Sequence, residues 1–205
     1  MFLEPSGGGA APKDQVAPRF AADGILRLHA VTQNRGQGHE TVFPELVGRT
    51  LGIAPEQIVL ATDDPIVATL MGDGVVGSRS MQQFGSAFKL GAEEVVRKGM
   101  LLAAKRLEAA PADIEFVDGT YRVKGPDLAV GMADLIEQVR GQSPHPLDSD
   151  AEALLSGFDA VAPLQASIER TLQRPLRGLW PAAHVKRLPT HAPVTRAVVR
   201  FSVLC

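Results

Sequence analysis

The sequence contains almost no cysteine, few aromatic residues, no long apolar run and no large excess of charge. Its single cysteine, Cys205, provides no disulfide framework, zinc knuckle or iron–sulfur ligand set, and we expect a reducing compartment. No apolar run approaches the roughly 20 residues that span a bilayer, so we expect no membrane association. A formal net charge of −2 offers no basic field to nucleic acid, which we exclude as a partner.

What the sequence does have is the composition of a folded protein. It has 205 residues, of which 45% are hydrophobic and 21% are charged, a balance typical of globular proteins. The first residues, MFLEPSGGGAAPKDQ, lack the basic and apolar segments of a secretory signal. We therefore expect a cytoplasmic protein with a substantial hydrophobic core.

Hydrophobic periodicity predicts an α+β fold, a mixed sheet with helices packed on one side. Alternating or continuous apolar runs predict strands over 25–32, 58–61, 114–117 and 121–124, the last two joined as a hairpin by Asp118-Gly119. Apolar residues at helical spacing predict helices over 40–51, 81–109 and 131–140. Glycines at 85, 91 and 99 of the long helix predict a closely packed neighbour. Residues 1–18 and 141–159 show no such pattern and are expected to be loops.

Two glycine-containing turns each lead into a predicted helix, RGQGHET at 35–41 and GSRS at 77–80. The first N–H groups of a helix have no intrahelical partner and carry partial positive charge, so they bind anions. Glycine lets a phosphate approach the backbone closely. Gln37, Ser78 and Ser80 add polar donors, and Arg79 could add a charge-assisted contact. Two such turns in one domain suit a pyrophosphate.

On the residues alone, ordinary helix capping by Thr41 or Ser80 explains each turn better than phosphate binding does. The first turn has Thr41 where a dinucleotide fingerprint needs a third glycine, and neither turn is a P-loop. His39-Glu40 is not a zinc motif, because Phe43 stands where the second histidine would be. His39 is therefore interpreted as structural, and the sequence predicts neither a metal ligand nor a catalytic residue.

An ordered set of segments nevertheless resembles a known family. The segments that carry the resemblance are, in order, RGQGHET (35–41), LGIAPEQI (51–58), GSRS (77–80), APADIEFVDG (110–119) and YRVKG (121–125). Through them the chain resembles the molybdopterin-binding subunit of the xanthine dehydrogenase and aldehyde oxidase family, in particular its carbon monoxide dehydrogenase-like branch. The resemblance runs from about residue 3 to about residue 140. It implies one part of the family's molybdopterin-binding domain pair, and it favours phosphate binding over capping at both turns.

The resemblance implies a cofactor, partners and site residues. The cofactor is molybdopterin cytosine dinucleotide, and the family uses it to hydroxylate carbon centres or to oxidise aldehydes, purines, heterocycles or carbon monoxide. The matching positions for its phosphate-bearing part are Gly36, Gln37, Gly38, Gly77, Ser78, Arg79 and Ser80, with His39 supporting the first turn. The implied partners are the other domains of the molybdenum subunit and separate iron–sulfur and flavin subunits.

The departures from the family are as informative as the match. The family's substrate-side glycine-rich loop and its catalytic glutamate, in a Gly-x-Gly-Glu setting, do not occur here. We therefore expect a fragment that is not catalytic alone, with a partial domain over 1–160 and a divergent Arg- and Pro-rich tail over 161–205 that ends in a strand. Two alternatives remain open: a non-catalytic cofactor-binding module, and a remnant that forms a homodimer through uncovered apolar surface.

Overall fold

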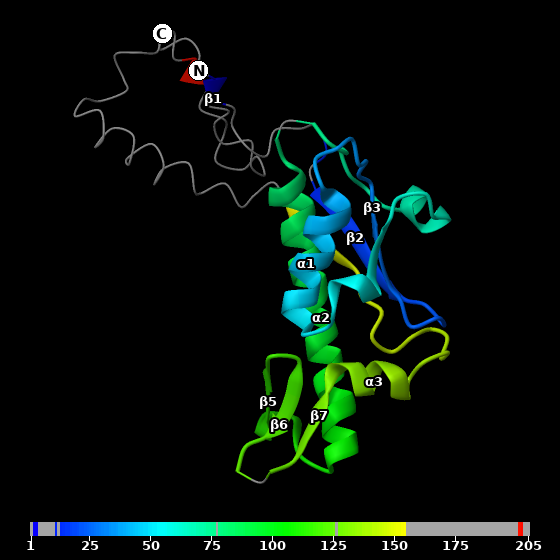
Figure 1. Cartoon of the computed structure of the whole chain (residues 1–205), viewed down its shortest axis with the longest axis vertical. Helices are drawn as coiled ribbons and strands as arrows, with labels where there is room; N and C mark the ends of the chain where they lie inside the picture. Colours follow the sequence, from blue (N-terminus) through cyan, green and yellow to red (C-terminus); the bar gives the residue numbers. More distant parts are fainter. Residues whose placement is uncertain are drawn as a thin grey trace, which may run out of the picture.

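The structure is a computed structural model that describes residues 2–3, 11, 13–76, 78–125, 127–154 and 201–202. Its strands are β1 (Phe2–Leu3), β2 (Lys13–Phe20), β3 (Leu26–Ala30), β4 (Ile58–Ala61), β5 (Ile114–Val117), β6 (Thr120–Val123), β7 (Ala129–Gly131), β8 (Ala151–Leu154) and β9 (Phe201–Ser202). Its α-helices are α1 (His39–Leu51), α2 (Ser80–Leu107) and α3 (Met132–Gln138). Short 3-10 turns are η1 (Pro55–Gln57), η2 (Pro65–Thr69) and η3 (Pro111–Asp113). Two larger sheets lie along the long helix α2 (Figure 1).

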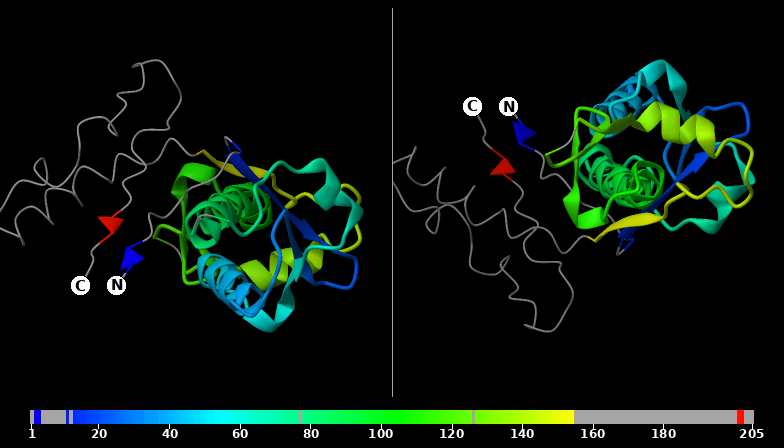
Figure 2. Two further views of the ribbon diagram at one scale, coloured as in Figure 1. Left: turned by 90° about the horizontal axis from the view of Figure 1, so that it is seen from above. Right: turned by 90° about the horizontal axis from the view of Figure 1, so that it is seen from below.

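The four-stranded sheet has the order β4-β3-β2-β8 and is mixed, as predicted. Strands β3 and β4 run parallel, with Leu26 opposite Ile58, while β2 runs antiparallel to both β3 and β8. Helices α1 and α2 lie together on one face of this sheet (Figure 2). The expected layer of helices on one side of a mixed sheet is therefore confirmed.

Two strands of this sheet lie in segments that the sequence analysis assigned to loops. Strand β2 is an interior strand, but Asp14 occupies a fully buried position where an alternating pattern would have an apolar residue. Pro18 also suggested a loop, yet it lies beyond residues 13–16, where β2 pairs with β8, so no hydrogen bond to β8 is lost there. Strand β8 has the sequence AEAL, whose alanine and glutamate are uncommon in strands. The loop predictions for these residues were wrong.

The second sheet is a three-stranded antiparallel meander of β5, β6 and β7. Its first turn is the predicted hairpin, with positive φ at both Asp118 (45°) and Gly119 (76°), as a two-residue turn of this kind requires. Strand β7 was not predicted, and it occupies the residues just before α3. The sheet packs against the C-terminal half of α2, at the opposite end of the helix from the four-stranded sheet (Figure 1).

Glycines in α2 mark close packing, as expected, at two of the three positions. A Cβ on Gly99 would lie 2.1 Å from the Tyr121 hydroxyl oxygen, and one on Gly91 would lie 3.1 Å from Pro18 Cγ. The Tyr121 hydroxyl donates a hydrogen bond to the Val96 carbonyl at 2.9 Å, and burial raises the pKa of Tyr121, so the phenol remains a donor. At Gly85 the nearest atoms belong to Met81 of the same helix, so no neighbouring element explains that glycine.

The predicted tail over 161–205 lies outside the described residues except for β9, which pairs antiparallel with β1. The strand expected near residues 195–204 is thus described only at Phe201–Ser202. Within the described part of the chain, no helix is long and apolar enough to cross a membrane.

Candidate functional site

The fold brings the two predicted turns to one end of the molecule. Strands β3 and β4 are parallel neighbours, so the connections that follow them leave the sheet at the same edge. One connection leads into α1 and the other into α2, and the two helices run in the same direction with their N-termini at that end (Figure 1). The rings of Phe43 and Phe88, 5.1 Å apart between centroids, pack the helices together.

Glycine in the first turn is required by backbone conformation rather than by lack of space. Gly36 has φ +91° and Gly38 has φ +77°, and a Cβ on either would meet no atom within 4 Å. Gly38 precedes α1 in a left-handed conformation, and no side chain caps the helix; Thr41 therefore does not serve as the cap. The first backbone N–H groups of α1 thus receive no side-chain cap, and the backbone beside them is open.

Gln37 closes this turn on itself. Its side-chain oxygen accepts a hydrogen bond from the Arg35 backbone N–H at 2.5 Å, and its side-chain nitrogen donates to the Gln33 carbonyl at 2.7 Å. The amide that we expected to face a phosphate therefore also shapes the loop over residues 33–37.

His39, the first residue of α1, links the helix to the end of β3. It is buried, its Nδ1 lies 3.0 Å from the Thr32 hydroxyl, and its ring lies 4.8 Å from that of Phe43. Burial lowers the pKa of His39, which favours the neutral ring. These contacts are those of a residue that supports the turn.

The second turn has a different backbone and different side chains, although its helix also lacks a side-chain cap. Gly77 lies outside the described residues, Ser78 is exposed with φ +52°, and Ser80 is the half-buried first residue of α2. No side chain caps α2 either, so Ser80 does not act as the cap proposed from the sequence. A hydroxyl at Ser78 and the first N–H groups of α2 are the polar groups available at this turn.

Arg79 does not face solvent. Its side chain is fully buried, with Nε 3.0 Å and Nη2 2.5 Å from Asp14 Oδ2, and Nη1 2.8 Å from Asp73 Oδ2. Its charge-assisted hydrogen bonds in this structure are made with two carboxylates of the chain. Asp14 and Asp73 were not among the site residues expected from the sequence; the local signal for Asp14 was a charged residue inside what proves to be a strand.

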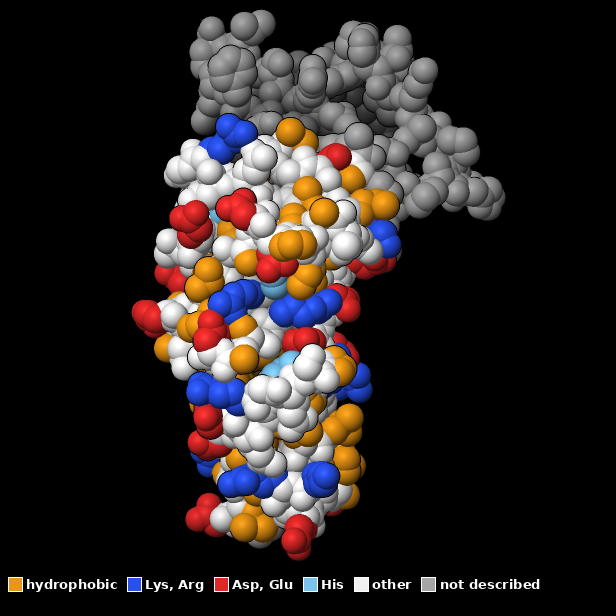
Figure 3. All heavy atoms as spheres, turned by 90° about the vertical axis from the view of Figure 1, so that its right-hand side faces the viewer, with side chains coloured by type: hydrophobic (Ala, Val, Ile, Leu, Met, Phe, Trp, Pro, Cys, Tyr) orange, Lys and Arg blue, Asp and Glu red, His pale blue; other side chains and the backbone are white. Residues whose placement is uncertain are grey.

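A cavity of about 500 Å³ lies between the start of the first turn and the segment that leads to the second turn. It is lined by Val31, Thr32, Gln33, Arg35, Thr62, Asp63, Val67, Asp73, Gly74, Val75 and Val76. Arg35 and Asp63 bring opposite charges to it, and side chains of both signs are interspersed on the face of the molecule seen in Figure 3. An anion at this end would therefore depend on local donors rather than on a broad positive field.

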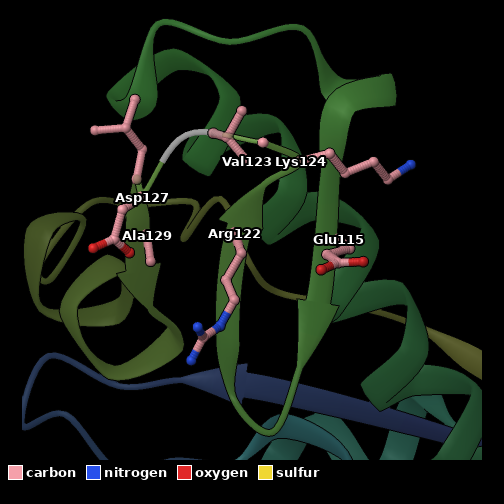
Figure 4. Close-up of a pocket in the computed structure, with 8 residues that line it drawn as sticks. Glu115, Arg122, Val123, Lys124, Asp127 and Ala129 are labelled. Atoms are coloured by element: carbon pink, nitrogen blue, oxygen red, sulfur yellow. The ribbon is translucent and has the colours of Figure 1, made fainter.

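A smaller hollow, of about 250 Å³, lies on the outer face of the three-stranded sheet. Arg122 and Glu115 project from the neighbouring strands β6 and β5, and Asp127 lies on the segment leading to β7 (Figure 4). The hollow belongs to the opposite end of α2 from the two turns (Figure 1). Among the described residues, no group of three or more His, Cys, Asp or Glu side chains is arranged to hold a metal.

Both turns lie in a part of the chain that matches a known protein family. Residues 1–156 match the family model described as the molybdopterin cofactor-binding domain. The chain belongs to this family. Its membership confirms the resemblance to xanthine dehydrogenase-type proteins, including the carbon monoxide dehydrogenase-like branch.

Individual relatives agree with the family match. The chain is 34% identical over 131 residues to the carbon monoxide dehydrogenase large chain of Hydrogenophaga pseudoflava, which covers 63% of this chain and 16% of that protein. It is 39% identical over 102 residues to the 6-hydroxypseudooxynicotine dehydrogenase complex subunit gamma of Paenarthrobacter nicotinovorans, covering 49% of this chain and 12% of the relative.

A solved structure shows the same relationship. The crystal structure of Cu,Mo-CO dehydrogenase in its carbon monoxide reduced state is similar with a TM-score of 0.59 and 27% identity, over 71% of this chain and 19% of that one. The chain thus spans less than a fifth of the length of each of these relatives.

Proposed function

We propose that this chain is part of the cofactor-binding subunit of a molybdenum hydroxylase, in which it holds the phosphate-bearing part of a molybdopterin dinucleotide and is not catalytic alone. The observation that supports this most directly is the meeting of two helix N-termini, neither capped by a side chain, at one end of parallel strands. Such ends bind phosphate through backbone N–H groups.

The residues at this end fit a phosphate group. Gly36 and Gly38 leave the backbone open, and Gln37 and the exposed Ser78 supply polar groups beside it. We assign phosphate contacts to these residues, to Ser80 and to Gly77, with His39 in support. Arg79 supports the second turn from the protein interior, where its guanidinium is bound to Asp14 and Asp73. The bound cofactor would supply the redox-active molybdenum, while this chain binds and orients it.

The finer assignments extend the family membership. We propose the cytosine dinucleotide form of the cofactor, a functional unit over residues 1–160, and action together with further domains and with iron–sulfur and flavin subunits in the cytoplasm. The partners and the cofactor form are supported by the relatives, which include a large chain of carbon monoxide dehydrogenase and a subunit of a dehydrogenase complex. The unit is supported by the family match over residues 1–156, and the cytoplasm by the near absence of cysteine. The short coverage of those relatives supports dependence on complementing chains.

Co-purification tests the proposal. The 205-residue chain is expressed in a host that makes molybdopterin dinucleotide, with and without the products of its neighbouring genes, and molybdenum, pterin and cytosine nucleotide are assayed. We expect cofactor only with the partners, and a reduced content in Gln37→Ala and Ser78→Ala. Gln57→Ala and Ser86→Ala, exposed residues away from the turns, are the matched controls.

The other outcomes separate the alternatives. Cofactor in the lone chain would favour an autonomous binding module. Absence of cofactor from both preparations would contradict the proposal and favour a remnant without ligand. In that case, a dimer measured by sedimentation would identify the self-associating form.

A further inference from the structure

A buried ion cluster joins the second turn to the middle of the four-stranded sheet. Arg79 and Asp14 are fully buried, and the side chain of Asp73 is 19% exposed. Asp14 lies in β2, where it pairs with Ala153 of β8; β3 pairs with β2 only from Val16 onward. Arg79, immediately before α2, is thus tied to an interior strand of the four-stranded sheet.

The same carboxylate orders the segment that leads to the turn. Asp14 Oδ1 accepts a hydrogen bond from the Asp73 backbone N–H at 3.0 Å. Next to it, the Gln15 backbone N–H donates to the Met71 carbonyl at 2.8 Å, and the Met71 N–H donates to the Gln15 side-chain oxygen at 2.9 Å. Residues 71–73 therefore run along β2 through backbone and side-chain bonds.

Packing at Gly72 fixes this segment against both the sheet and α2. A Cβ there would lie 3.0 Å from Asp14 Oδ1, 3.1 Å from Val31 Cβ and 3.2 Å from Phe84 Cζ. There is therefore little room for a side chain at this position, and the backbone of Gly72 lies close to β2 and to α2. The segment that leads into the second turn is therefore held close to the sheet and to α2.

Ser78 needs such support. Its φ of +52° lies in the left-handed region, which is unfavourable for residues other than glycine and persists only where the surroundings impose it. Its neighbour Arg79 is held by three hydrogen bonds to two carboxylates. The ion cluster is thus in position to impose the backbone conformation of the turn.

The charges of the cluster argue against Arg79 as a direct phosphate ligand. One guanidinium and two carboxylates carry a formal charge of −1, counted over Arg79, Asp14 and Asp73. A phosphate would therefore gain little attraction from the cluster, and its binding at this turn would depend on the N–H groups and hydroxyls that the turn presents.

We propose that Asp14 and Asp73 are positioning residues, which hold Arg79 inside the protein and thereby fix the second turn in its anion-binding conformation. This inference rests on the proposed function, because it assigns how one of the two phosphate-binding turns is built. It reverses the role that the GSRS segment suggests: its arginine acts through the backbone and not on the ligand.

Removal of the Asp14 charge gives opposite results for the two roles. We measure the affinity of the 205-residue chain for inorganic pyrophosphate by calorimetry. If Arg79 is held to position the turn, Asp14→Asn weakens binding about tenfold, although it removes a negative charge. If Arg79 were a direct ligand, the same substitution would release it and strengthen binding, which would overturn the proposal. Asp63→Asn, which removes a charge from the adjoining cavity without touching Arg79, is the control and should change affinity by less than about threefold.

Hydrogen exchange of the ligand-free chain provides a second readout that needs no binding. Asp14→Asn should accelerate exchange of the backbone amides of residues 78–83 at least tenfold, while those of α3 stay unchanged. Asp73→Asn, at a partly exposed site, should do the same to a smaller degree and serves if Asp14→Asn does not fold. Unchanged exchange at 78–83 in a folded variant would overturn the proposal. If the wild-type chain does not bind pyrophosphate without its partners, the exchange data alone decide the positioning role. Absence of cofactor from the co-expressed complex is the separate result that would count against the proposed function.

Discussion

The two turns that lead into α1 and α2 present comparable helix ends but are built differently. The first turn relies on Gly36 and Gly38, whose positive φ values cost glycine little and whose surroundings are open. The second places a serine in the left-handed region and anchors the next residue, Arg79, to two buried carboxylates. The first turn depends on the conformational freedom of glycine, and the second depends on buried ion pairs. Substitutions should therefore affect the two turns through different physical causes.

The largest difference should follow loss of an arginine. Arg79→Met removes the cation that pairs with the fully buried carboxylate of Asp14, which should lower the free energy of unfolding by about 3–5 kcal/mol. Arg35→Met, at an exposed residue of the first turn, should change it by less than about 0.5 kcal/mol. Urea denaturation measures both, and equal losses would contradict the contrast between the turns.

Adding a methyl group should destabilise the protein through steric overlap near the second turn, but not at the first turn. Gly72→Ala places a methyl group within 3.2 Å of three side chains, at a cost of about 1–3 kcal/mol. Gly36→Ala meets no atom within 4 Å, and its cost of about 1–2 kcal/mol comes from backbone strain alone. Combined with Phe84→Leu, Gly72→Ala should therefore be non-additive and Gly36→Ala additive. Additivity in both double variants would refute this assignment of causes.

Relief of strain at the second turn should stabilise the protein slightly. Ser78→Gly removes a left-handed penalty of about 1–2 kcal/mol and adds an entropic cost of about 0.5–1 kcal/mol, for a net gain of about 0.5 kcal/mol. Ser86→Gly, within α2, should instead destabilise by about 1 kcal/mol. Thermal unfolding of the two variants should thus move in opposite directions.

The smallest expected effect is a pH dependence at the first turn. Burial lowers the pKa of His39 below its ordinary value of 6.5, so the unfolded chain binds this proton more readily than the folded one. Its contribution to stability is complete above about pH 6.5 and is lost as the pH falls through the folded-state pKa. His39→Gln should reduce the slope of unfolding free energy between pH 7.5 and 5 without abolishing it, because burial also lowers the pKa of His145. An identical slope in the variant would exclude His39 as a source.

Local patterns were enough to predict the elements whose signal is local. The helices at 39–51 and 80–107, the strand at 58–61 and the Asp118-Gly119 hairpin depend on periodicity and turn chemistry within a few residues of each other. Strand β2 did not follow its local pattern, because Asp14 is buried only through a partner 65 residues away in the chain. Such a pairing is invisible until the fold is known.

The same limitation applied to the candidate site. The two turns could be located from the sequence because glycine and helix periodicity mark them, and their convergence follows from parallel β3 and β4. The orientation of Arg79 could not be predicted, since a guanidinium beside a turn serves a phosphate or a carboxylate equally well. Only the positions of Asp14 and Asp73 distinguish the two.

The pairing of β2 with β8 also sets the order in which the protein can be completed during synthesis. Lys13 in β2 and Glu152 in β8 are 139 residues apart in sequence. During synthesis, the edge of β2 that pairs with β8 therefore stays unpaired until nearly all of the described chain has left the ribosome. During that interval the edge is open to pairing with other strands. Nascent chains that stop before Ala151 should therefore be prone to aggregation, and chaperones that shield strand edges would act on this protein chiefly at that stage.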